Sequence, residues 1–461
     1  MEKRHLYIEL YENLKQQIIE GQYQSGDKFP SKRALGQHLS VSNTTIEHAY
    51  QFLLDEGYIY SKPRSGYFVS DIETLPIIKR NHSQLNGPSL DMISNNRHND
   101  QSYQYAFNLS EIDAEYFPML QFRKYARDVF EDNQLGLLQH TNPKGEWSLR
   151  QEIAHYLFNS RGVTCHPEQI IIGSSTEQLI NLLTDMLSKE QFIIENPSYP
   201  PIKQVLDKKQ IPYLQTPVNK TGIDLNYFSQ TNNNIAYVTP SHQFPTGYVM
   251  NLKKRTQLIN WAHQNEYRYI IEDDYDSEFR YFGKPIPALQ SLDTKDKVIY
   301  ISTFSKSLFP SCRIAYLVLP KKLLAQYEHL KNKEGNTVPA HLQKIVANFM
   351  ESGSFERHLN KMRKVYSRKL KFILEKLKPY EDQLQIDGAL AGMHFTLTVK
   401  NGYSMDQCLK NAANNQLKIL PFYHYDKNQT SVKFILGFGG IPFSELNDHT
   451  NALINSLCLC L

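Results

Sequence analysis

Apolar runs of strand length alternate with helical segments over the middle of the chain. We expect strands at 169–172, 191–195, 235–239, 269–273, 298–302 and 314–319. Helices fall between some of these runs, for example at 178–187 and 253–264. Strands that alternate with helices usually form a mainly parallel sheet with helices on its faces. The pattern therefore predicts an α/β body over residues 104–461.

The last part of this body has a different pattern. Long helices are expected at 342–352 and 355–377, and short strands at 394–399 and 432–436. Long helices mixed with short strands are typical of an α+β arrangement. We therefore expect a smaller C-terminal α+β subdomain over about 342–461.

Residues 1–70 form a separate unit. Apolar residues at helical spacing predict helices at 5–19, 32–39 and 42–56. A hairpin over 58–70 follows, with glycine in its turn. Helices and a hairpin in this order predict a winged helix-turn-helix.

Residues 71–103 join the two units. They are rich in Asn, Ser, His and Asp and show no sustained periodicity. We expect them to form a flexible linker.

Composition excludes several classes of protein. The chain has 461 residues, of which 41% are hydrophobic and 21% charged, so it is neither a disordered chain nor a coiled-coil rod. Its apolar runs are too short to span a membrane, and its charged N-terminus lacks a secretory signal, so we expect a cytoplasmic protein. The five cysteines are scattered, which indicates neither a disulfide framework nor a metal site.

The third expected helix of the head begins with short polar residues. Ser42, Asn43, Thr44 and Thr45 would fit the major groove of double-stranded DNA. Phosphate contacts are expected from the cations Lys32, Arg33, Lys62 and Arg64. Acidic and basic residues balance over the head, so a protein-binding winged helix remains an alternative.

Lys306 follows an expected strand and lies among small hydroxyl residues. A lysine there suits a Schiff base, because partial burial lowers the pKa of an amine and leaves it free to attack an aldehyde. Arg313, Thr303 and Ser305 would suit a phosphate. A lone surface lysine remains the simpler alternative.

Two other strand ends carry polar groups. Asp273 and Tyr275 follow an apolar run, at the edge where α/β sheets place their sites. The Gly-Ser turn at 173–175 lies at a strand-to-helix junction, where free backbone N–H groups bind anions. For the acidic segment the alternatives are a solvated loop or a metal site. For residues 173–175 the alternative is an ordinary turn.

The head resembles the GntR family of DNA-binding domains. The motifs that carry this resemblance, in order, are 6–18, 26–35, 41–45 and 54–59. It implies that Arg33, the start of the third helix and the wing tip with Gly66 contact DNA. Asn43 departs from the family, which often has Arg there.

The body resembles the fold-type-I, aspartate-aminotransferase-like proteins that use pyridoxal 5′-phosphate (PLP). The matching segments are 142–145, 149–163, 195–200, 239–247 and 392–395, together with Asp273 and Lys306. Joined to a GntR-type head, this body resembles the MocR-type transcription regulators.

The resemblance implies a role for each residue of the cofactor site. Lys306 would form the Schiff base, Asp273 would pair with the pyridine nitrogen and Tyr275 would approach the ring oxygen. Tyr199 would stack on the ring, and Gln243 stands near the place of a family Asn. The expected phosphate-binding residues are Ser175, Thr176, Thr303, Ser305 and Arg313.

The resemblance leaves the effector open. The Arg that commonly binds a carboxylate near the C-terminus is absent, and Lys433, His424 and His394 are the candidates to replace it. A GABA effector is therefore not expected, and the signal is either PLP itself or an amine or amino acid that condenses with it. A homodimer is implied, in which the head of one chain lies over the body of the other.

Three functions follow from these expectations. We favour a PLP-dependent transcription regulator without sustained turnover. The alternatives are a working aminotransferase that carries a DNA-binding head, and a DNA-binding protein whose body is inactive.

Overall fold

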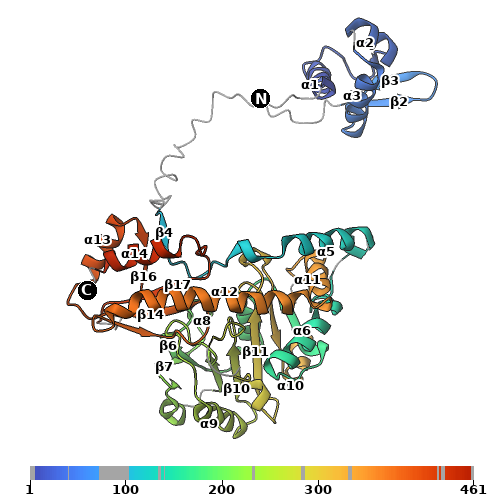
Figure 1. The fold of residues 1–461 in the computed structure, drawn as a ribbon. Helices are drawn as coiled ribbons and strands as arrows, with labels where there is room; N and C mark the ends of the chain where they lie inside the picture. The colour runs from blue at the N-terminus through green and yellow to red at the C-terminus, as the bar shows by residue number, and fades with distance from the viewer. Residues whose placement is uncertain are drawn as a thin grey trace. The chain divides into compact units, whose positions relative to one another are not determined.

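The computed structural model describes residues 6–39, 41–71, 103–132, 136–139, 141–230, 234–281, 286–330, 335–422, 425–426 and 431–457. The chain divides into two compact units, residues 1–100 and 101–461 (Figure 1). Apart from its two end residues, the predicted linker lies outside the described residues, and so does His424.

The smaller unit is the winged helix-turn-helix that the sequence predicts. Its helices are α1 (Leu6–Ile19), α2 (Lys32–Leu39) and α3 (Asn43–Asp55). Its strands β1 (Lys28–Phe29), β2 (Ile59–Lys62) and β3 (Gly66–Val69) form an antiparallel sheet in the order β1-β3-β2. The strand β1 was not predicted.

Apolar residues at helical spacing hold the head together. Leu14 and Ile18 of α1 meet Ile46, Tyr50 and Leu53 of α3 in one buried cluster. Because these side chains recur every three or four residues, they form one buried face of each helix, and the short polar residues at the start of α3 lie away from that face. The start of α3 therefore remains exposed.

The larger unit is built on an eight-stranded sheet. Its described strands lie in the order β5-β12-β11-β10-β9-β6-β7-β8. Their bounds are β5 (Ile170–Gly173), β6 (Phe192–Asn196), β7 (Tyr213–Asn219), β8 (Gly222–Ile223), β9 (Ile235–Val238), β10 (Tyr269–Asp273), β11 (Val298–Thr303) and β12 (Ala315–Val318). The pairs from β7 through β11 are parallel, whereas β12 is antiparallel to both of its neighbours and β8 is antiparallel to β7.

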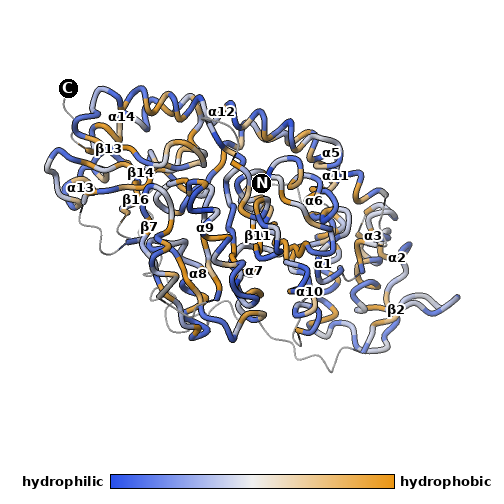
Figure 2. Tube along the Cα trace, turned by 90° about the horizontal axis from the view of Figure 1, so that it is seen from below, coloured by the Kyte–Doolittle hydropathy of each residue, from blue (hydrophilic) through white to orange (hydrophobic). Residues whose placement is uncertain are grey.

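Helices cover both faces of this sheet (Figure 1). The helices of this part are α6 (Trp147–Arg161), α7 (Thr176–Met186), α8 (Pro200–Lys209), α9 (Leu252–His263), α10 (Lys321–Glu328), α11 (Ala340–Glu351) and α12 (Ser354–Leu377), and α5 (Met119–Asp132) packs against α11. Successive strand residues point to opposite faces. Ile194 of β6 thus packs in the core with α7, α8 and α10, and Ile193 packs in the core with α9. Figure 2 shows hydrophobic residues along β11 and a mixed pattern along α12.

A smaller α+β part follows α12. Its antiparallel sheet has the order β13-β14-β17-β16, with β13 (Leu384–Asp387), β14 (His394–Val399), β16 (Leu420–Pro421) and β17 (Lys433–Gly437). Its helices are α13 (Met405–Asn414) and α14 (Leu446–Ser456). A short strand β15 (Leu417–Lys418) pairs in parallel with β4 (Tyr105–Ala106), the first strand of the body. Among the described helices, none is both long and apolar enough to cross a membrane.

Candidate functional site

A cavity of about 390 Å³ lies at the carboxyl ends of the central strands. This is the edge at which open α/β sheets form their sites. All predicted cofactor residues except Gln243 line this cavity: Tyr199, Ser175, Thr176, Asp273, Tyr275, Thr303, Ser305, Lys306 and Arg313. The fold thus brings together residues that are scattered along the sequence.

Asp273 ends β10 and is buried. Its Oδ2 accepts a hydrogen bond from the hydroxyl of Tyr237, and its buried Oδ1 has no partner among the described residues. Burial raises the pKa of the Asp273 carboxyl to about 7, while the Tyr237 hydrogen bond opposes that rise. A buried carboxylate with one free oxygen beside a cavity fits a cationic N–H donor.

Lys306 lies in the loop after β11 and is partly buried. Its Nζ donates a hydrogen bond to the backbone carbonyl of Leu109. Burial lowers the pKa of the Lys306 amine to about 8, and the negative charges of Asp276 and Glu111 partly offset this effect. With this pKa about a tenth of the amine is neutral at pH 7, far more than for an ordinary lysine, and the neutral amine is a nucleophile.

One end of the cavity suits an anion. Ser175 is the N-cap of α7, and its Oγ accepts the N–H of Gln178 at 3.1 Å. An alanine Cβ at Gly173 would lie 2.8 Å from Leu179, so glycine lets β5 lie close to this helix start. The hydroxyls of Thr303 and Ser305 are 3.0 Å apart.

The groups at this end share one preference. Ser175 and Thr176 at the start of α7 line the same cavity as Arg313, Thr303 and Ser305. Helix N-termini, hydroxyls and guanidinium groups all bind phosphate. This end of the cavity therefore matches a phosphate group.

Aromatic side chains form another part of the lining. The ring centroids of Tyr199 and Phe244 are 5.6 Å apart, and those of Phe244 and Tyr425 are 5.1 Å apart. Burial raises the pKa of Tyr199 to about 12. These side chains give an aromatic ligand a surface to pack against.

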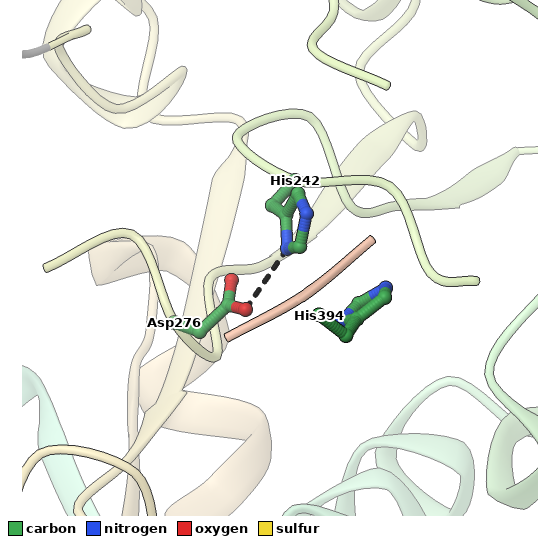
Figure 3. A group of neighbouring side chains, drawn as sticks. All are labelled: His242, Asp276 and His394. Carbon is green, nitrogen blue, oxygen red and sulfur yellow. Dashed lines mark hydrogen bonds and ion pairs between the residues drawn. The ribbon is translucent and has the colours of Figure 1, made fainter. Parts of the chain in front are cut away.

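His242, Asp276 and His394 form a buried polar cluster (Figure 3), and His242 also contacts Tyr275. Nδ1 of His242 lies 2.9 Å from Oδ2 of Asp276 and 3.2 Å from the hydroxyl of Tyr275. The backbone N–H of Met393 donates to the same Asp276 oxygen at 3.3 Å. Ring centroids of His242 and His394 are 4.5 Å apart.

Together, His242, Asp276 and His394 offer ligand atoms within 4.8 Å of one another, a set that could hold a metal ion. Nδ1 of His242 is already hydrogen-bonded, whereas Nε2 of His242 and of His394 have no partner among the described residues. Gly392 has a φ of +72°, and a Cβ there would lie 2.2 Å from the His242 ring. Only glycine leaves room for this imidazole.

The predicted effector residues fall in different places. His394 lines the cavity, but burial, His242 and Lys306 hold the pKa of its imidazole well below the usual range, so it is uncharged. Lys433 is buried outside the cavity lining, with its Nζ 4.4 Å from the centre of the Phe422 ring. His424 lies outside the described residues.

Gln243 also lies outside the cavity lining. Its Nε2 donates to the carbonyls of Pro197 and Phe244 at 2.8 and 2.6 Å, and its Oε1 accepts the N–H of Thr246 at 3.1 Å. The amide is therefore occupied in joining two loops next to the site.

The predicted DNA-contacting residues gather at two places on the head. Ser42 caps α3 and accepts the N–H of Thr45 at 3.2 Å, which leaves Asn43 and Thr44 exposed at the start of the helix. Lys32 forms an ion pair with Glu47 at 2.7 Å. Neighbouring Arg33 is exposed.

The wing tip is the second place. Lys62 ends β2 and lies 4.7 Å from the centre of the Phe68 ring. Arg64 and Gly66 have φ values of +61° and +108°, as the tight turn between β2 and β3 requires. These residues form the exposed tip of the hairpin.

Several residues of the site were not predicted from the sequence. They are Leu109, Ser110, Phe244, Asp276, Met393 and Tyr425 in the lining, and Tyr237 and His242 behind it. Asp276 stood in the acidic run after β10, and His242, Phe244 and Met393 fall within the segments 239–247 and 392–395 that carry the resemblance, but none of them was assigned a role. Leu109, Ser110, Tyr237 and Tyr425 had no such signal, because they come together only in the folded chain.

Two family models match the chain. Residues 6–69 match the bacterial regulatory proteins of the gntR family, and residues 107–419 match aminotransferase class I and II. The first match implies DNA binding. The second implies a fold that generally depends on PLP.

Proteins named as HTH-type transcriptional regulators match nearly the whole chain. The uncharacterized HTH-type transcriptional regulator YdeL of Bacillus subtilis (strain 168) is 36% identical over 96% of this chain and 95% of its own length. The probable rhizopine catabolism regulatory protein MocR of Rhizobium meliloti is 31% identical over 97% of this chain and 93% of its own length. This chain belongs to the MocR family of transcriptional regulators. Another relative, the pyridoxine biosynthesis transcriptional regulator PdxR of Corynebacterium glutamicum, is 27% identical over 90% of this chain and 88% of its own length.

Solved structures agree with the fold of a MocR-family body. The multiple substrate aminotransferase from Thermococcus profundus covers 78% of this chain at 22% identity with a TM-score of 0.68, and 92% of that structure is matched. An archaeal alanine:glyoxylate aminotransferase matches 76% of this chain and 89% of its own, at 21% identity, with a TM-score of 0.69. The predicted fold, a winged head joined to a fold-type-I body, is confirmed. Because the relatives of similar length are regulators, regulation is favoured over an aminotransferase role.

Proposed function

We propose that this MocR-family regulator binds PLP in the body cavity and binds double-stranded operator DNA through its head, in the cytoplasm. Binding of PLP, or of an amine or amino acid that condenses with it, would change the grip on DNA. The observation that carries the proposal is that one cavity contains both a nucleophilic lysine and a buried carboxylate with one oxygen that lacks a hydrogen-bond partner in the described part of the chain. Lys306 and Asp273 both line it.

The residues present fit PLP at three points. Asp273 has a buried oxygen without a partner, as a protonated ring nitrogen needs. The start of α7, Arg313 and the hydroxyls of Thr303 and Ser305 fit the phosphate. The aromatic lining fits the ring. When bound, PLP would supply an aldehyde that condenses with amines and a ring that withdraws electrons.

Each residue then has a stated task. Asp273 would hold a proton on the ring nitrogen, since a buried carboxylate favours a cationic partner. Tyr275, supported by His242, would donate to the ring oxygen. Tyr199 would cover the ring and exclude water. Lys306 would offer its neutral amine.

In the head, as in other winged helices, one set of residues would contact base edges and another set would contact phosphates. Asn43 and Thr44, with Ser42 and Thr45 beside them, would face base edges from the start of α3. The expected phosphate contacts are Arg33, Lys62, Arg64 and the backbone at Gly66, with Lys32 released from Glu47.

We also propose a homodimer in which the head of each chain lies over the body of the other. Exposed apolar side chains support a subunit interface on α5 and α6. Leu120 is 75% exposed and Phe158 is 62% exposed. Large apolar side chains left in water are typical of interaction surfaces.

DNA binding with and without PLP tests the proposal. The protein would first select its preferred sites from a random DNA pool. We expect a visible absorption band when PLP is added, together with a changed DNA affinity or footprint. Lys306→Ala should give no band and should bind the same DNA identically with and without PLP. A PLP response that survives in Lys306→Ala would contradict the proposal, and sustained keto-acid formation from any amino acid would favour an enzyme instead.

A further inference from the structure

Lys306 contacts a segment that is distant in the sequence. Its Nζ donates to the carbonyl of Leu109, 197 residues earlier. The described residues offer that carbonyl no other hydrogen-bond donor. Leu109 belongs to the short stretch 107–113, which we call the entry segment because it follows β4, where the chain enters the body from the head.

The entry segment is fixed at its first end by backbone pairing. The N–H of Phe107 donates to the carbonyl of Lys418 at 3.2 Å, and the N–H of Gly437 donates to the carbonyl of Phe107 at 3.2 Å. The first of these bonds continues the pairing of β4 with β15, and the second joins Phe107 to the end of β17. They tie the start of the segment to the small subdomain.

Its second end is fixed by a buried ion pair. Oδ2 of Asp113 lies 2.7 Å from Nζ of Lys369, and both side chains are almost fully buried. Nζ of Lys369 also donates to the carbonyl of Gly439 at 2.9 Å. Leu109 therefore lies between two fixed points.

Glycines allow the backbone of the segment to lie directly on the neighbouring strand and loop. A Cβ at Gly437 would lie 2.2 Å from the carbonyl oxygen of Asn108, and one at Gly439 would lie 2.7 Å from that of Glu111. Packing of backbone against backbone leaves no side chains to absorb a shift. A change at Leu109 is thus transmitted to the rest of the segment.

The chemistry of Lys306 changes the hydrogen bond at Leu109. When the neutral amine condenses with an aldehyde, a carbon–nitrogen double bond forms and the aldehyde oxygen leaves as water, with two hydrogens of the amine. The nitrogen then keeps no hydrogen, or one if it is protonated beside an anionic oxygen. An amine that takes over the aldehyde returns Lys306 to the free state with its N–H groups restored.

We propose that the Leu109 carbonyl distinguishes free from condensed Lys306, so that the entry segment is held when the amine is free and loosened when it is condensed. This inference rests on the proposed function, because it requires PLP at Lys306. PLP alone would then loosen the entry segment, and PLP together with an amine effector would leave it held. The change occurs where the connection from the head enters the body.

Hydrogen–deuterium exchange of the full-length protein tests this inference. Peptides covering 105–113 and β17 are compared with no ligand, with PLP and with pyridoxamine 5′-phosphate. The last compound has the same ring and phosphate but no aldehyde, so it leaves Lys306 free. With PLP we expect exchange of the Phe107 and Gly437 amides to be about three- to tenfold faster than with pyridoxamine 5′-phosphate, which is the effect of one lost hydrogen bond.

Two variants serve as references for fast exchange in the entry segment. Lys306→Ala, shown to be folded by its thermal melt, should exchange fast in this segment in all three states. Lys369→Met, which breaks the other anchor, shows how fast a loosened segment exchanges. Equal exchange with the two ligands, while the visible band proves condensation, would overturn the inference and leave the proposed function intact. If PLP gives no band at all, the proposed function fails and this inference with it.

Discussion

The hydroxyl of Tyr237, on β9, donates a hydrogen bond to Oδ2 of Asp273, at the end of β10. The two strands are parallel neighbours, so the pair is set by the register of the central sheet. The tyrosine helps to keep a buried carboxylate ionised and leaves its other oxygen unpartnered at the cavity. The sheet itself thus prepares the group that would bind a ring nitrogen.

Tyr237→Phe should weaken PLP binding. Without the hydroxyl, the pKa of Asp273 rises further and less carboxylate is available to pair with the ring. The loss of one hydrogen bond, about 1 kcal/mol, predicts a roughly fivefold higher Kd in a visible-absorbance titration. Tyr300→Phe is the matched control, because Tyr300 donates at 2.6 Å to Asp274, which does not line the cavity. An equal loss in both variants would contradict this role.

The rate at which PLP condenses with Lys306 should depend on pH in a defined way. Only the neutral amine attacks, and burial lowers its pKa from 10.5 to about 8. The neutral fraction therefore rises as pH increases through about 8 and is constant above about 9. Stopped-flow absorbance with excess PLP between pH 6 and 10 measures this. A rate that still rises severalfold between pH 9 and pH 10 would show an ordinary lysine, whose pKa is 10.5.

Gly392→Ala should damage the site and the fold together. The new Cβ would lie 2.2 Å from His242 and 2.3 Å from Asp276, at a φ of +72°. We expect the free energy of unfolding of the body to fall by about 3 kcal/mol. Gly402→Ala is the control, since its φ is +85° but nothing lies within 4 Å of the added Cβ. In denaturant melts, Gly402→Ala should lower the free energy of unfolding by about 1 kcal/mol. If Gly392→Ala lowers it by no more than this, the alanine does not collide with His242.

Arg33→Ala should weaken DNA binding for all sequences alike. A phosphate contact adds affinity without specificity, so its removal lowers the slope of log K against log salt by about one. Fluorescence anisotropy on specific and unrelated duplexes at several salt concentrations measures both effects. Lys15→Ala is the control, because Lys15 is paired with Glu56 at 2.5 Å. A sequence-dependent loss would instead assign Arg33 a base contact.

Lys433→Met should leave the response to amines and amino acids unchanged. The ammonium group lies over the Phe422 ring and outside the cavity lining, so it does not meet a ligand held at Lys306. Shifts of the visible band with a panel of amines should give Kd values within about twofold of the original protein. Loss of the response to carboxylate-bearing amines alone would restore Lys433 as their binding residue.

Much of the fold was predictable because its elements have strong local patterns. The head helices follow from residues such as Leu14 and Ile46, and the strands from continuous apolar runs. The strand β1 was missed because two residues carry no periodicity. The sequence of β12 also does not indicate that this strand is antiparallel, because an apolar run occurs in both parallel and antiparallel strands.

The site residues that lie at or just after the end of a single strand were predictable from the sequence. Asp273 and Lys306 each end or follow one, and both line the cavity. The pair of His242 and Asp276 joins residues 34 apart, and Lys306 and Leu109 are 197 apart. Gln243 and Lys433 lie outside the cavity lining, where the Gln243 amide donates to the Pro197 carbonyl and Nζ of Lys433 lies over the Phe422 ring. Such partners appear only once the chain is folded.

The bare backbone of Gly437 and Gly439 limits where the two units can be cut apart. A truncated protein that begins after Glu111 would lose β4 and the atoms that cover these glycines, and would open the side of the cavity that Leu109 and Ser110 line. A protein that begins at Tyr103 keeps all of them. The first residues of the body thus belong to its ligand cavity as much as to its connection with the head.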